Sequence, residues 1–500
     1  MNRSRFSLSV RGSLFAASLL VLPVGCDSDP AGSGGAGGTT TTSDPDRDAA
    51  LALVGADACG DTLDSVYEAA TAPSPWSASM RGEVVRCAYD RVVTAEEMTA
   101  HYTDESLPPL TATTDVYKFR VAYWTERNEG EPVLTSGSFY LPKTMRGSPS
   151  PLLIVGHGSV GIADKCAPSR EDPDGFHRDF RTQLYSLIGD GWAVLAPDFP
   201  GLGTPGAATW MYSPDEGHAM LDGTRAARKI AKAGLFSDKN VIVGHSNGGH
   251  AALSAQSYAK AYGSEGSIDA VVVYAPFWLS NGAWGALITN VGNALITPAF
   301  LSMSMQYFYG HLAAYEGEDK ATSGFLPDKA EGIGTFLEGG CWQNVAREGD
   351  NGPEAIGLKK GADGFTMDYT GEIGNCGLNG NCTTPLQTTW KERWTVDRPP
   401  PDPTIPIVLW HGAKDDFLTP GFALCGVDRL QGQGADLTVC IDEEGDHSSL
   451  ISTSADWVHS YLESVLLGGE GPAPCVGVEA LGPDAKCSVP IPNSVDPNEP

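Results

Sequence analysis

Residues 241–248 read VIVGHSNG, a short apolar run that passes into the pattern G-x-S-x-G. The small and apolar residues that follow, through Ala255, recur at helical spacing. A strand that ends in a sharp turn and continues as a helix is what a nucleophile elbow needs, because the turn exposes the serine at the top of a sheet. Ser246 is therefore the candidate nucleophile of a serine hydrolase.

Further short apolar runs occur at 152–155, 193–196, 271–274 and 405–410. Such runs are typical of parallel strands that are buried on both faces of a sheet. Residues 215–233 have the helical spacing of a crossover between two such strands. The pattern predicts an α/β-hydrolase fold, with a mostly parallel sheet and helices on both faces. An antiparallel pair over 116–124 and 133–141 is expected before the parallel strands.

Residues 275–404 separate two of these apolar runs, and a structureless loop of that length is improbable. We therefore predict that residues 276–403 form a large inserted cap or lid that is mostly helical. It interrupts an α/β-hydrolase core whose two parts span 51–275 and 404–467. Residues 468–500, rich in proline, glycine and valine, are expected to form a C-terminal tail on the surface.

A serine hydroxyl becomes nucleophilic when a base takes its proton, and an acid must orient that base. In an α/β-hydrolase the acid and then the histidine follow the serine along the chain. The acid is expected in the loop after the strand at 405–410, where Asp415 is preferred and Asp416 is the alternative. The base is expected in the loop after residues 437–441, and we assign it to His447.

The negative charge that develops on the carbonyl oxygen needs two N–H donors, which form an oxyanion hole. One donor is the backbone N–H of the residue after the nucleophile, here Asn247. The other is expected from residues 155–159, which read VGHGS, with Ser159 preferred and Gly158 as the alternate. This chemistry needs no metal ion or organic cofactor, and none is expected.

The first 25 residues predict a signal peptide, because arginines precede an apolar segment at 14–24 that is too short to span a membrane. The segment ends at Cys26 in the sequence PVGC. This resembles a bacterial lipobox, although Pro23 stands where leucine is expected. Lipidation of Cys26 would tether the protein to a membrane, and ordinary secretion is the alternative. Residues 26–50 are expected to be a flexible linker.

The chain has eleven cysteines, an odd number that leaves one over in an exported protein. If Cys26 carries lipid, the other ten can form five disulfides in an oxidising compartment. Spacing does not determine connectivity. Sequence proximity suggests four pairs and leaves one long-range pair: Cys59–Cys87, Cys376–Cys382, Cys425–Cys440, Cys475–Cys487 and, over the longest separation, Cys166–Cys341.

The formal net charge is −29 at pH 7. Removal of residues 1–25 takes away three arginines and no acidic residue, which leaves −32. Such an acidic surface repels nucleic acid and anionic lipid head groups, and it favours solubility. The composition therefore argues against a DNA or RNA partner, but it does not identify the substrate.

Residues 157–161 read HGSVG and residues 166–169 read CAPS. Together they resemble the HGTxG…CAPS stretch of secreted lipases of the α/β-hydrolase superfamily. Residues 196–203, the helix at 221–227 and the elbow are similar too. The resemblance covers the chain from about Val116 to about Leu466.

The resemblance implies a role for each matching residue. Ser246 would be the nucleophile, Asp415 the acid and His447 the base, and the long insertion would serve as a lid. Ser159 and Asn247 would supply the oxyanion donors. The chain departs from the family pattern at both of these positions, because threonine is expected at the first and glutamine is common at the second.

These observations predict a secreted lipase or esterase that cleaves small-molecule or lipid esters through an acyl-enzyme intermediate. It is expected outside the cell or in the periplasm, anchored by a lipid on Cys26. One alternative is a peptidase or polyester depolymerase with the same triad. Another is a surface binding protein that keeps the hydrolase scaffold without chemistry. The acyl chain, the alcohol and the oligomeric state are left open.

Overall fold

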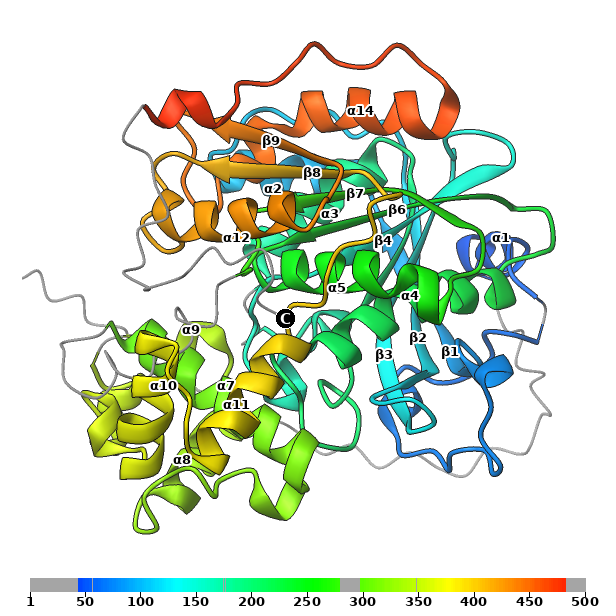
Figure 1. Ribbon diagram of the computed structural model, residues 1–500. Helices are drawn as coiled ribbons and strands as arrows, with labels where there is room; N and C mark the ends of the chain where they lie inside the picture. Colours follow the sequence, from blue (N-terminus) through cyan, green and yellow to red (C-terminus); the bar gives the residue numbers. More distant parts are fainter. Residues whose placement is uncertain are drawn as a thin grey trace, which may run out of the picture. The chain divides into compact units, whose positions relative to one another are not determined.

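A nine-stranded sheet forms the centre of the protein in its computed structural model, which describes residues 44–482 except 56, 174, 176, 279–296 and 348. The spatial order is β1-β2-β3-β5-β4-β6-β7-β8-β9 (Figure 1). The first three neighbouring pairs in this order, β1-β2, β2-β3 and β3-β5, are antiparallel. The remaining pairs, from β5-β4 to β8-β9, are parallel. The strands are β1 (Val84–Val93), β2 (Val116–Glu126), β3 (Pro132–Pro142), β4 (Ser150–Gly156), β5 (Ala193–Pro197), β6 (Phe236–His245), β7 (Ser267–Tyr274), β8 (Ile407–Gly412) and β9 (Leu437–Asp442).

Alternate side chains of the parallel strands pack into two cores, one on each face of the sheet. Ile154 and Ile242 belong to the core under α1 (Pro45–Leu51), α4 (Ser213–Ile230), α5 (Asn247–Tyr262) and α12 (Pro420–Gly432). Val155 and Val243 belong to the core under α2 (Ala95–Asp104), α3 (Arg178–Gly189), α13 (Leu450–Thr453) and α14 (Ala455–Leu467). Because helices cover both faces, these strands need unbroken apolar runs rather than an alternating pattern.

Between β7 and β8 the chain leaves the sheet and forms a helical segment, here called the insertion, over residues 297–397. In Figure 1 it lies below the sheet. Its aromatic side chains pack together, with ring centroids 4.7 Å apart for Phe308 and Trp390. Val160 and Trp210 share this cluster, so the insertion has a continuous core with the loops next to the sheet. Its helices are α7 (Pro298–Glu316), α8 (Ala330–Gly339), α9 (Trp342–Val345), α10 (Gly374–Asn379) and α11 (Pro385–Val396).

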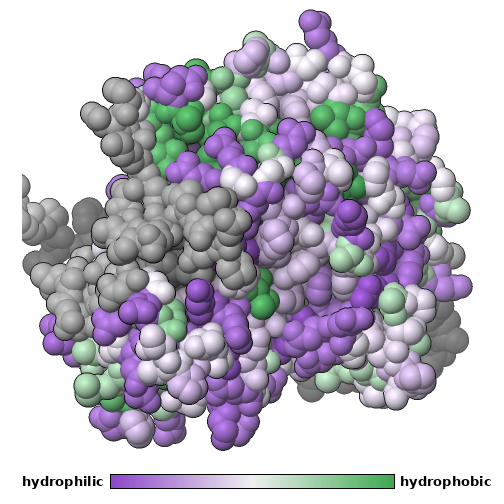
Figure 2. Space-filling model, viewed as in Figure 1, coloured by the Kyte–Doolittle hydropathy of each residue, from purple (hydrophilic) through white to green (hydrophobic). Residues whose placement is uncertain are grey.

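Short helical turns complete the described chain: η1 (Ser65–Tyr67), η2 (Ala78–Met80), η3 (Asp164–Cys166), η4 (Pro168–Arg170), η5 (Glu318–Lys320), η6 (Pro353–Ile356), η7 (Gly361–Asp363), η8 (Asp368–Ile373) and η9 (Val478–Leu481). Within the described ranges, no helix has the length and apolar character required to cross a membrane. The face seen in Figure 2 is mostly hydrophilic, in keeping with the net charge of −29.

The linker predicted over 26–50 is shorter than expected, because its last six residues lie in α1. Asp44 caps this helix by accepting hydrogen bonds from the N–H groups of Asp46 and Arg47, and Pro45 occupies the first helical position. Ala50 is fully buried against the core. The capping signal is present in the sequence, but the surrounding glycine-, serine- and threonine-rich composition obscured it.

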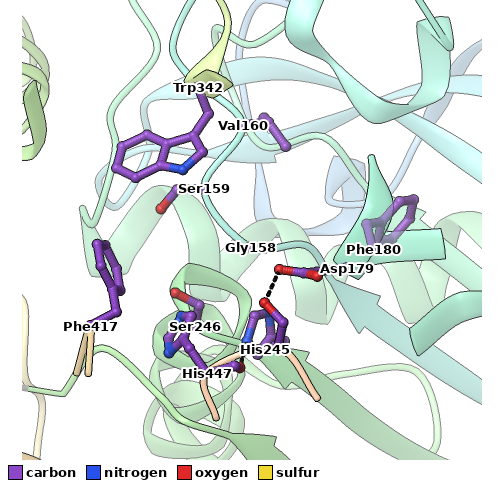
Figure 3. Close-up of a pocket in the computed structure, with 11 residues that line it drawn as sticks. Gly158, Ser159, Val160, Asp179, Phe180, His245, Ser246, Trp342, Phe417 and His447 are labelled. Atoms are coloured by element: carbon purple, nitrogen blue, oxygen red, sulfur yellow. Dashed lines mark hydrogen bonds between the residues drawn. The ribbon is translucent and has the colours of Figure 1, made fainter. Parts of the chain in front are cut away.

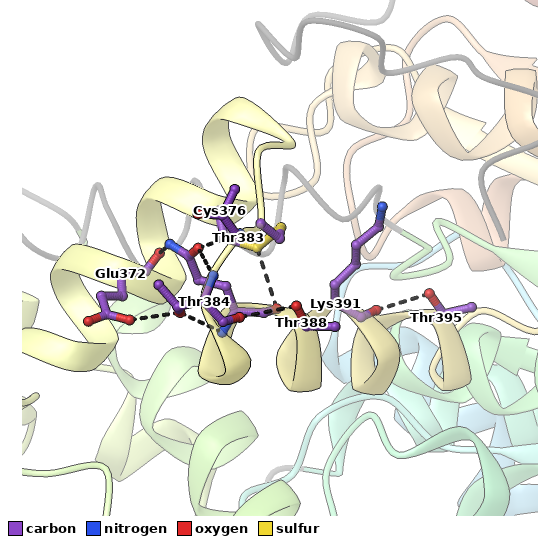
Figure 4. Close-up of a disulfide and its surroundings, with 9 residues drawn as sticks. Glu372, Cys376, Thr383, Thr384, Thr388, Lys391 and Thr395 are labelled. Carbon is purple, nitrogen blue, oxygen red and sulfur yellow. Dashed lines mark hydrogen bonds between the residues drawn. A yellow bond between two sulfur atoms is a disulfide. The ribbon is translucent and has the colours of Figure 1, made fainter.

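Three of the expected disulfides are confirmed: Cys59–Cys87, Cys166–Cys341 and Cys376–Cys382. The last joins α10 to the chain just before α11 (Figure 4). There, Thr384 and Gln387 form a capping box, in which each side chain accepts a hydrogen bond from the other residue's N–H. The capping box, with Pro385 in the first helical position, marks where α11 begins.

The expected pairs Cys425–Cys440 and Cys475–Cys487 are wrong, because Cys440 is bonded to Cys475. Cys440 points from β9 into the core on the α14 side of the sheet, whereas α12, which carries Cys425, packs on the opposite side. The sheet therefore separates those two cysteines. The tail returns along β9, where the Ile441 N–H donates to the Val476 carbonyl at 2.6 Å. Cys487 lies outside the described residues.

His218 on α4 is a buried histidine that we expect to make the protein less stable in acid. Its ring stacks on Tyr262 at 3.9 Å, and Nδ1–H donates to the Glu126 carbonyl at 2.9 Å. Burial lowers its pKa to about 4. The pKa of a histidine in the unfolded chain is about 6.5. Between pH 6.5 and the folded pKa of about 4, the unfolded chain therefore binds a proton that the folded protein does not. The free energy of unfolding must therefore fall as the pH falls through this range.

The substitution His218→Phe keeps a ring against Tyr262 and removes the titration. We expect it to reduce the dependence of the unfolding free energy on pH by up to about 1.4 kcal/mol per pH unit between about pH 6 and about pH 4.5. Urea unfolding of both proteins at several pH values measures this slope. An unchanged slope would show that another group causes the acid sensitivity.

Candidate active site

Ser246 lies in the sharp turn between β6 and α5, with φ 53° and ψ −114°. A positive φ is strained for a residue with a side chain and persists where the surroundings impose it. Here the Ser246 N–H donates to the Tyr274 carbonyl at 2.9 Å. A side chain at Gly244 or Gly248 would collide with neighbouring backbone carbonyls, so both glycines of the elbow are sterically required. The strand, turn and helix expected from the sequence are all present.

Asp415 and His447 are in direct contact. His447 Nδ1–H donates to Asp415 Oδ2 at 2.8 Å. The other carboxylate oxygen of Asp415, Oδ1, accepts from the N–H groups of Phe417 and Leu418 at 3.0 and 2.7 Å. Asp415 is 2% exposed, so its carboxylate is held in one orientation. Because Nδ1 is engaged by Asp415, Nε2 is the histidine nitrogen left to exchange a proton.

The alternative acid, Asp416, has a different environment. Its side chain is exposed and lines an open polar depression together with Lys414 and Glu444. The loop after β8 thus turns consecutive aspartates in different directions, and Asp415 is the one bonded to His447. Sequence spacing alone could not separate these two residues.

Ser246 and His447 line one cavity of about 230 Å³ (Figure 3). Gly158 and Ser159, from the loop after β4, line it as well. Asn247 is the first residue of α5, where the backbone N–H groups have no partner within the helix. The Ser159 hydroxyl is already engaged, because it accepts from Trp210 Nε1–H at 3.0 Å.

Several residues that line the cavity were not anticipated from the sequence. They come from α3, from the insertion and from the loops after β8 and β9: Asp179, Phe180, Trp342, Phe417 and Ser448. Most carry no local pattern that distinguishes them. Trp342 is different, because it follows Cys341, and the expected Cys166–Cys341 disulfide already linked that segment to the HGSVG…CAPS region.

His245 supports the backbone beneath His447. Its Nε2–H donates to the His447 carbonyl at 2.8 Å. Burial, and after it charge repulsion by the neighbouring His447, lowers the pKa of His245 to about 4. His245 therefore stays neutral at neutral pH, so it holds the loop that carries His447 without adding positive charge beside it.

A buried polar network connects the helix after Ser246 with the insertion. His250 Nδ1 contacts Glu216 Oε2 at 2.6 Å, and its Nε2 contacts the Asp397 carbonyl at 2.8 Å. Burial alone would lower the pKa of His250, but the Glu216 and Asp397 carboxylates raise it above its usual value. The network ties the end of the insertion to α5, one turn beyond Ser246.

The mostly parallel sheet and the strand, turn and helix around Ser246 form an α/β-hydrolase-like fold. Solved structures support this fold. A protein from Legionella pneumophila that is named a putative hydrolase superposes with a TM-score of 0.59 at 16% identity, covering 76% of this chain and 98% of that one. The rice cell wall degrading esterase LipA from Xanthomonas oryzae gives 0.57 at 19% identity, covering 78% and 99%. Candida antarctica lipase A in its closed state gives 0.55 at 15% identity, covering 81% and 90%.

Residues 180–293 match the sequence model of the secretory lipase family. The match covers less than a quarter of the chain, and it agrees with the resemblance to secreted lipases expected from the sequence. The matched segment contains Ser246 and Asn247, whereas Asp415 and His447 follow it. No curated protein matches the chain significantly. In the described part of the chain, no group of three or more His, Cys, Asp or Glu side chains is placed to hold a metal ion.

Proposed function

We propose that the protein is a secreted carboxylic ester hydrolase that acts through an acyl-enzyme intermediate. The observation that carries the proposal is the bond of 2.8 Å between His447 and buried Asp415, beside a cavity that also contains the strained Ser246. These are the parts that serine catalysis needs: a nucleophile, a base and an acid that orients the base. The secretory lipase segment makes an ester the expected substrate.

In the first half of the reaction, Ser246 Oγ attacks the ester carbonyl while His447 Nε2 takes the serine proton. Asp415 keeps the proton of His447 on Nδ1, so Nε2 is free to act as the base. The oxyanion accepts hydrogen bonds from the backbone N–H groups of Ser159 and Asn247. Loss of one such donor typically costs about 3 to 4 kcal/mol of transition-state stabilisation.

The tetrahedral intermediate then collapses, and the alcohol leaves with the proton from His447. This forms an ester between the acyl group and Ser246. In the second half, His447 takes a proton from water, which attacks the acyl carbonyl. The acid is released as the proton returns to Ser246.

The insertion would act as a cap on this site, within a segment that we place at residues 276–403. It contributes Trp342 to the cavity wall, and the Cys166–Cys341 disulfide joins it to the core. The two parts of the core would span 51–275 and 404–467, followed by a tail over 468–500. Any opening of the cap must therefore leave the part that carries Cys341 in place.

The disulfides indicate an extracellular or otherwise oxidising location. The match to secretory lipases is consistent with this location. We extend the proposal to a signal peptide over residues 1–25 and a lipid on Cys26, which would hold the enzyme at a membrane. Both lie outside the described residues. Metabolic labelling with a fatty acid, with Cys26→Ser as the control, would test the anchor.

Reaction with a fluorophosphonate probe tests the proposed nucleophile, since this reagent modifies serines that a neighbouring base activates. We expect mass spectrometry to find the label on Ser246. Turnover of a p-nitrophenyl ester, a triacylglycerol, a soluble polyester and an aminoacyl anilide then defines the reaction class. Ester hydrolysis without anilide cleavage is the expected result, whereas preferential anilide cleavage would indicate a peptidase. A protein that is neither labelled nor active would be a binding protein on a hydrolase scaffold.

A further inference from the structure

A disulfide attaches the insertion to the loop that carries Ser159. Cys166 and Cys341 are 175 residues apart in the sequence, and both are fully buried. The next residue, Trp342, begins α9 and lines the cavity with Ser246. The disulfide therefore joins the segment that carries the aromatic side chain directly to the oxyanion side of the site.

Backbone contacts hold the same segment in place. The Trp342 N–H donates to the Val160 carbonyl at 2.8 Å. Gly161 has φ 97°, and a Cβ there would lie 3.1 Å from backbone atoms of Gly340, Cys341 and Trp342. The two segments thus pack backbone against backbone, which requires glycine at position 161. The backbone of Trp342 cannot withdraw from the cavity without breaking these contacts as well as the disulfide.

The rings of Trp342 and Phe417 meet edge to face at 6.3 Å. Phe417 also packs against the His447 ring at 5.0 Å and stacks on Phe300 at 5.4 Å. Figure 3 shows Trp342 above Ser159, whereas His447 lies on the other side of Ser246 in this view. Trp342 therefore forms an apolar wall on the side of the cavity away from His447, and Phe417 lies between the two rings.

The two halves of an ester occupy different sides of such a site. The leaving alcohol receives its proton from His447, so its oxygen must lie toward that side chain. The acyl chain then extends away from His447, toward Trp342. The cavity of about 230 Å³ is smaller than the range of about 300–1,000 Å³ that is usual for ligand sites. An aromatic wall there leaves space for few methylene groups.

We propose that Trp342 is a specificity-determining residue that limits the acyl group of the substrate to short chains. The Cys166–Cys341 disulfide and the contact at Gly161 hold its backbone in place, and the edge-to-face contact with Phe417 orients its ring. The inference rests on the proposed ester hydrolysis and deepens it by naming the substrate class, short-chain acyl esters. It assigns no part in the chemical step to Trp342.

The test compares p-nitrophenyl acetate, butyrate, octanoate and palmitate, so that the leaving group is constant and only the acyl chain varies. We expect kcat/KM of the wild-type protein to fall at least about tenfold from butyrate to octanoate, because a filled hydrophobic pocket discriminates against even one added methylene by about 10- to 200-fold. Trp342→Ala should raise the octanoate-to-acetate ratio of kcat/KM by at least about tenfold. Trp342→Phe should give an intermediate ratio.

Phe336→Ala is the matched control, because it removes an aromatic ring that packs against the core of the insertion. It should leave the ratio unchanged. Fluorophosphonate labelling of Ser246 checks that each variant keeps a working site. Equal wild-type activity on octanoate and acetate would overturn the inference without need of a variant, as would an unchanged ratio in a labelled Trp342→Ala protein. Absence of both labelling and hydrolysis in the wild-type protein would instead refute the proposed function.

Discussion

Ser246→Ala should reduce ester turnover by on the order of 10⁶-fold while the protein stays folded. The change deletes the oxygen that attacks the carbonyl, and the other two serine hydroxyls of the cavity are engaged elsewhere, Ser159 with Trp210 and Ser448 with Asp179. It removes a single atom from the wall of an existing cavity, so the packing of the core is preserved. Single-turnover kinetics with a p-nitrophenyl ester measure the loss, and thermal unfolding verifies the fold.

Ser257→Ala provides the matched control for this experiment. Ser257 lies on the same helix, α5, and its hydroxyl donates to the Leu253 carbonyl at 3.0 Å. It does not line the cavity with Ser246. The control should keep nearly full activity. Substantial turnover by Ser246→Ala would show that the assigned nucleophile is wrong.

Asp415→Asn should lower kcat by about 10⁴-fold. The amide oxygen would keep the hydrogen bonds from the N–H groups of Phe417 and Leu418, so the amide NH₂ would face His447 Nδ1. An NH₂ donor requires Nδ1 to be an acceptor, which moves the ring proton to Nε2. His447 then cannot take the proton of the attacking serine. The variant should fold normally, because its size and most of its hydrogen bonds are retained.

Asp416→Asn tests the neighbouring position with the same chemical change. Its side chain is exposed, away from the bond to His447, so we expect kcat to change by less than about threefold. Steady-state kinetics of the two variants, measured in the same buffer, decide the assignment. A larger loss from Asp416→Asn than from Asp415→Asn would reverse the roles of these aspartates.

Much of the fold could be predicted because its signals are local. The unbroken apolar runs of β4, β6 and β7 identify strands that helices cover on both faces. The glycines around Ser246 are visible in the sequence, and the structure shows why each is needed. The segment between β7 and β8 was expected to be mostly helical, and its described part is.

Contacts between segments that are distant in the sequence were harder to predict. Cys440 and Cys475 form a bond because the tail returns along β9 after α14, and no spacing rule records that return. Sequence proximity favoured Cys425 as the partner of Cys440, although the sheet lies between these two cysteines. The first helix, α1, was assigned to a linker because composition outweighed the capping signal of Asp44.

The sequence by itself determined the order of strand, turn and helix around Ser246, because backbone periodicity and glycine sterics act over a few neighbouring residues. It also limited the acid to Asp415 or Asp416. Only the tertiary structure brings one of them, Asp415, against His447, since the orientation of each carboxylate depends on which backbone N–H groups and which histidine it meets. The same holds for the cavity, whose wall combines Trp342, Phe417 and Asp179 from segments that meet only when the chain is folded.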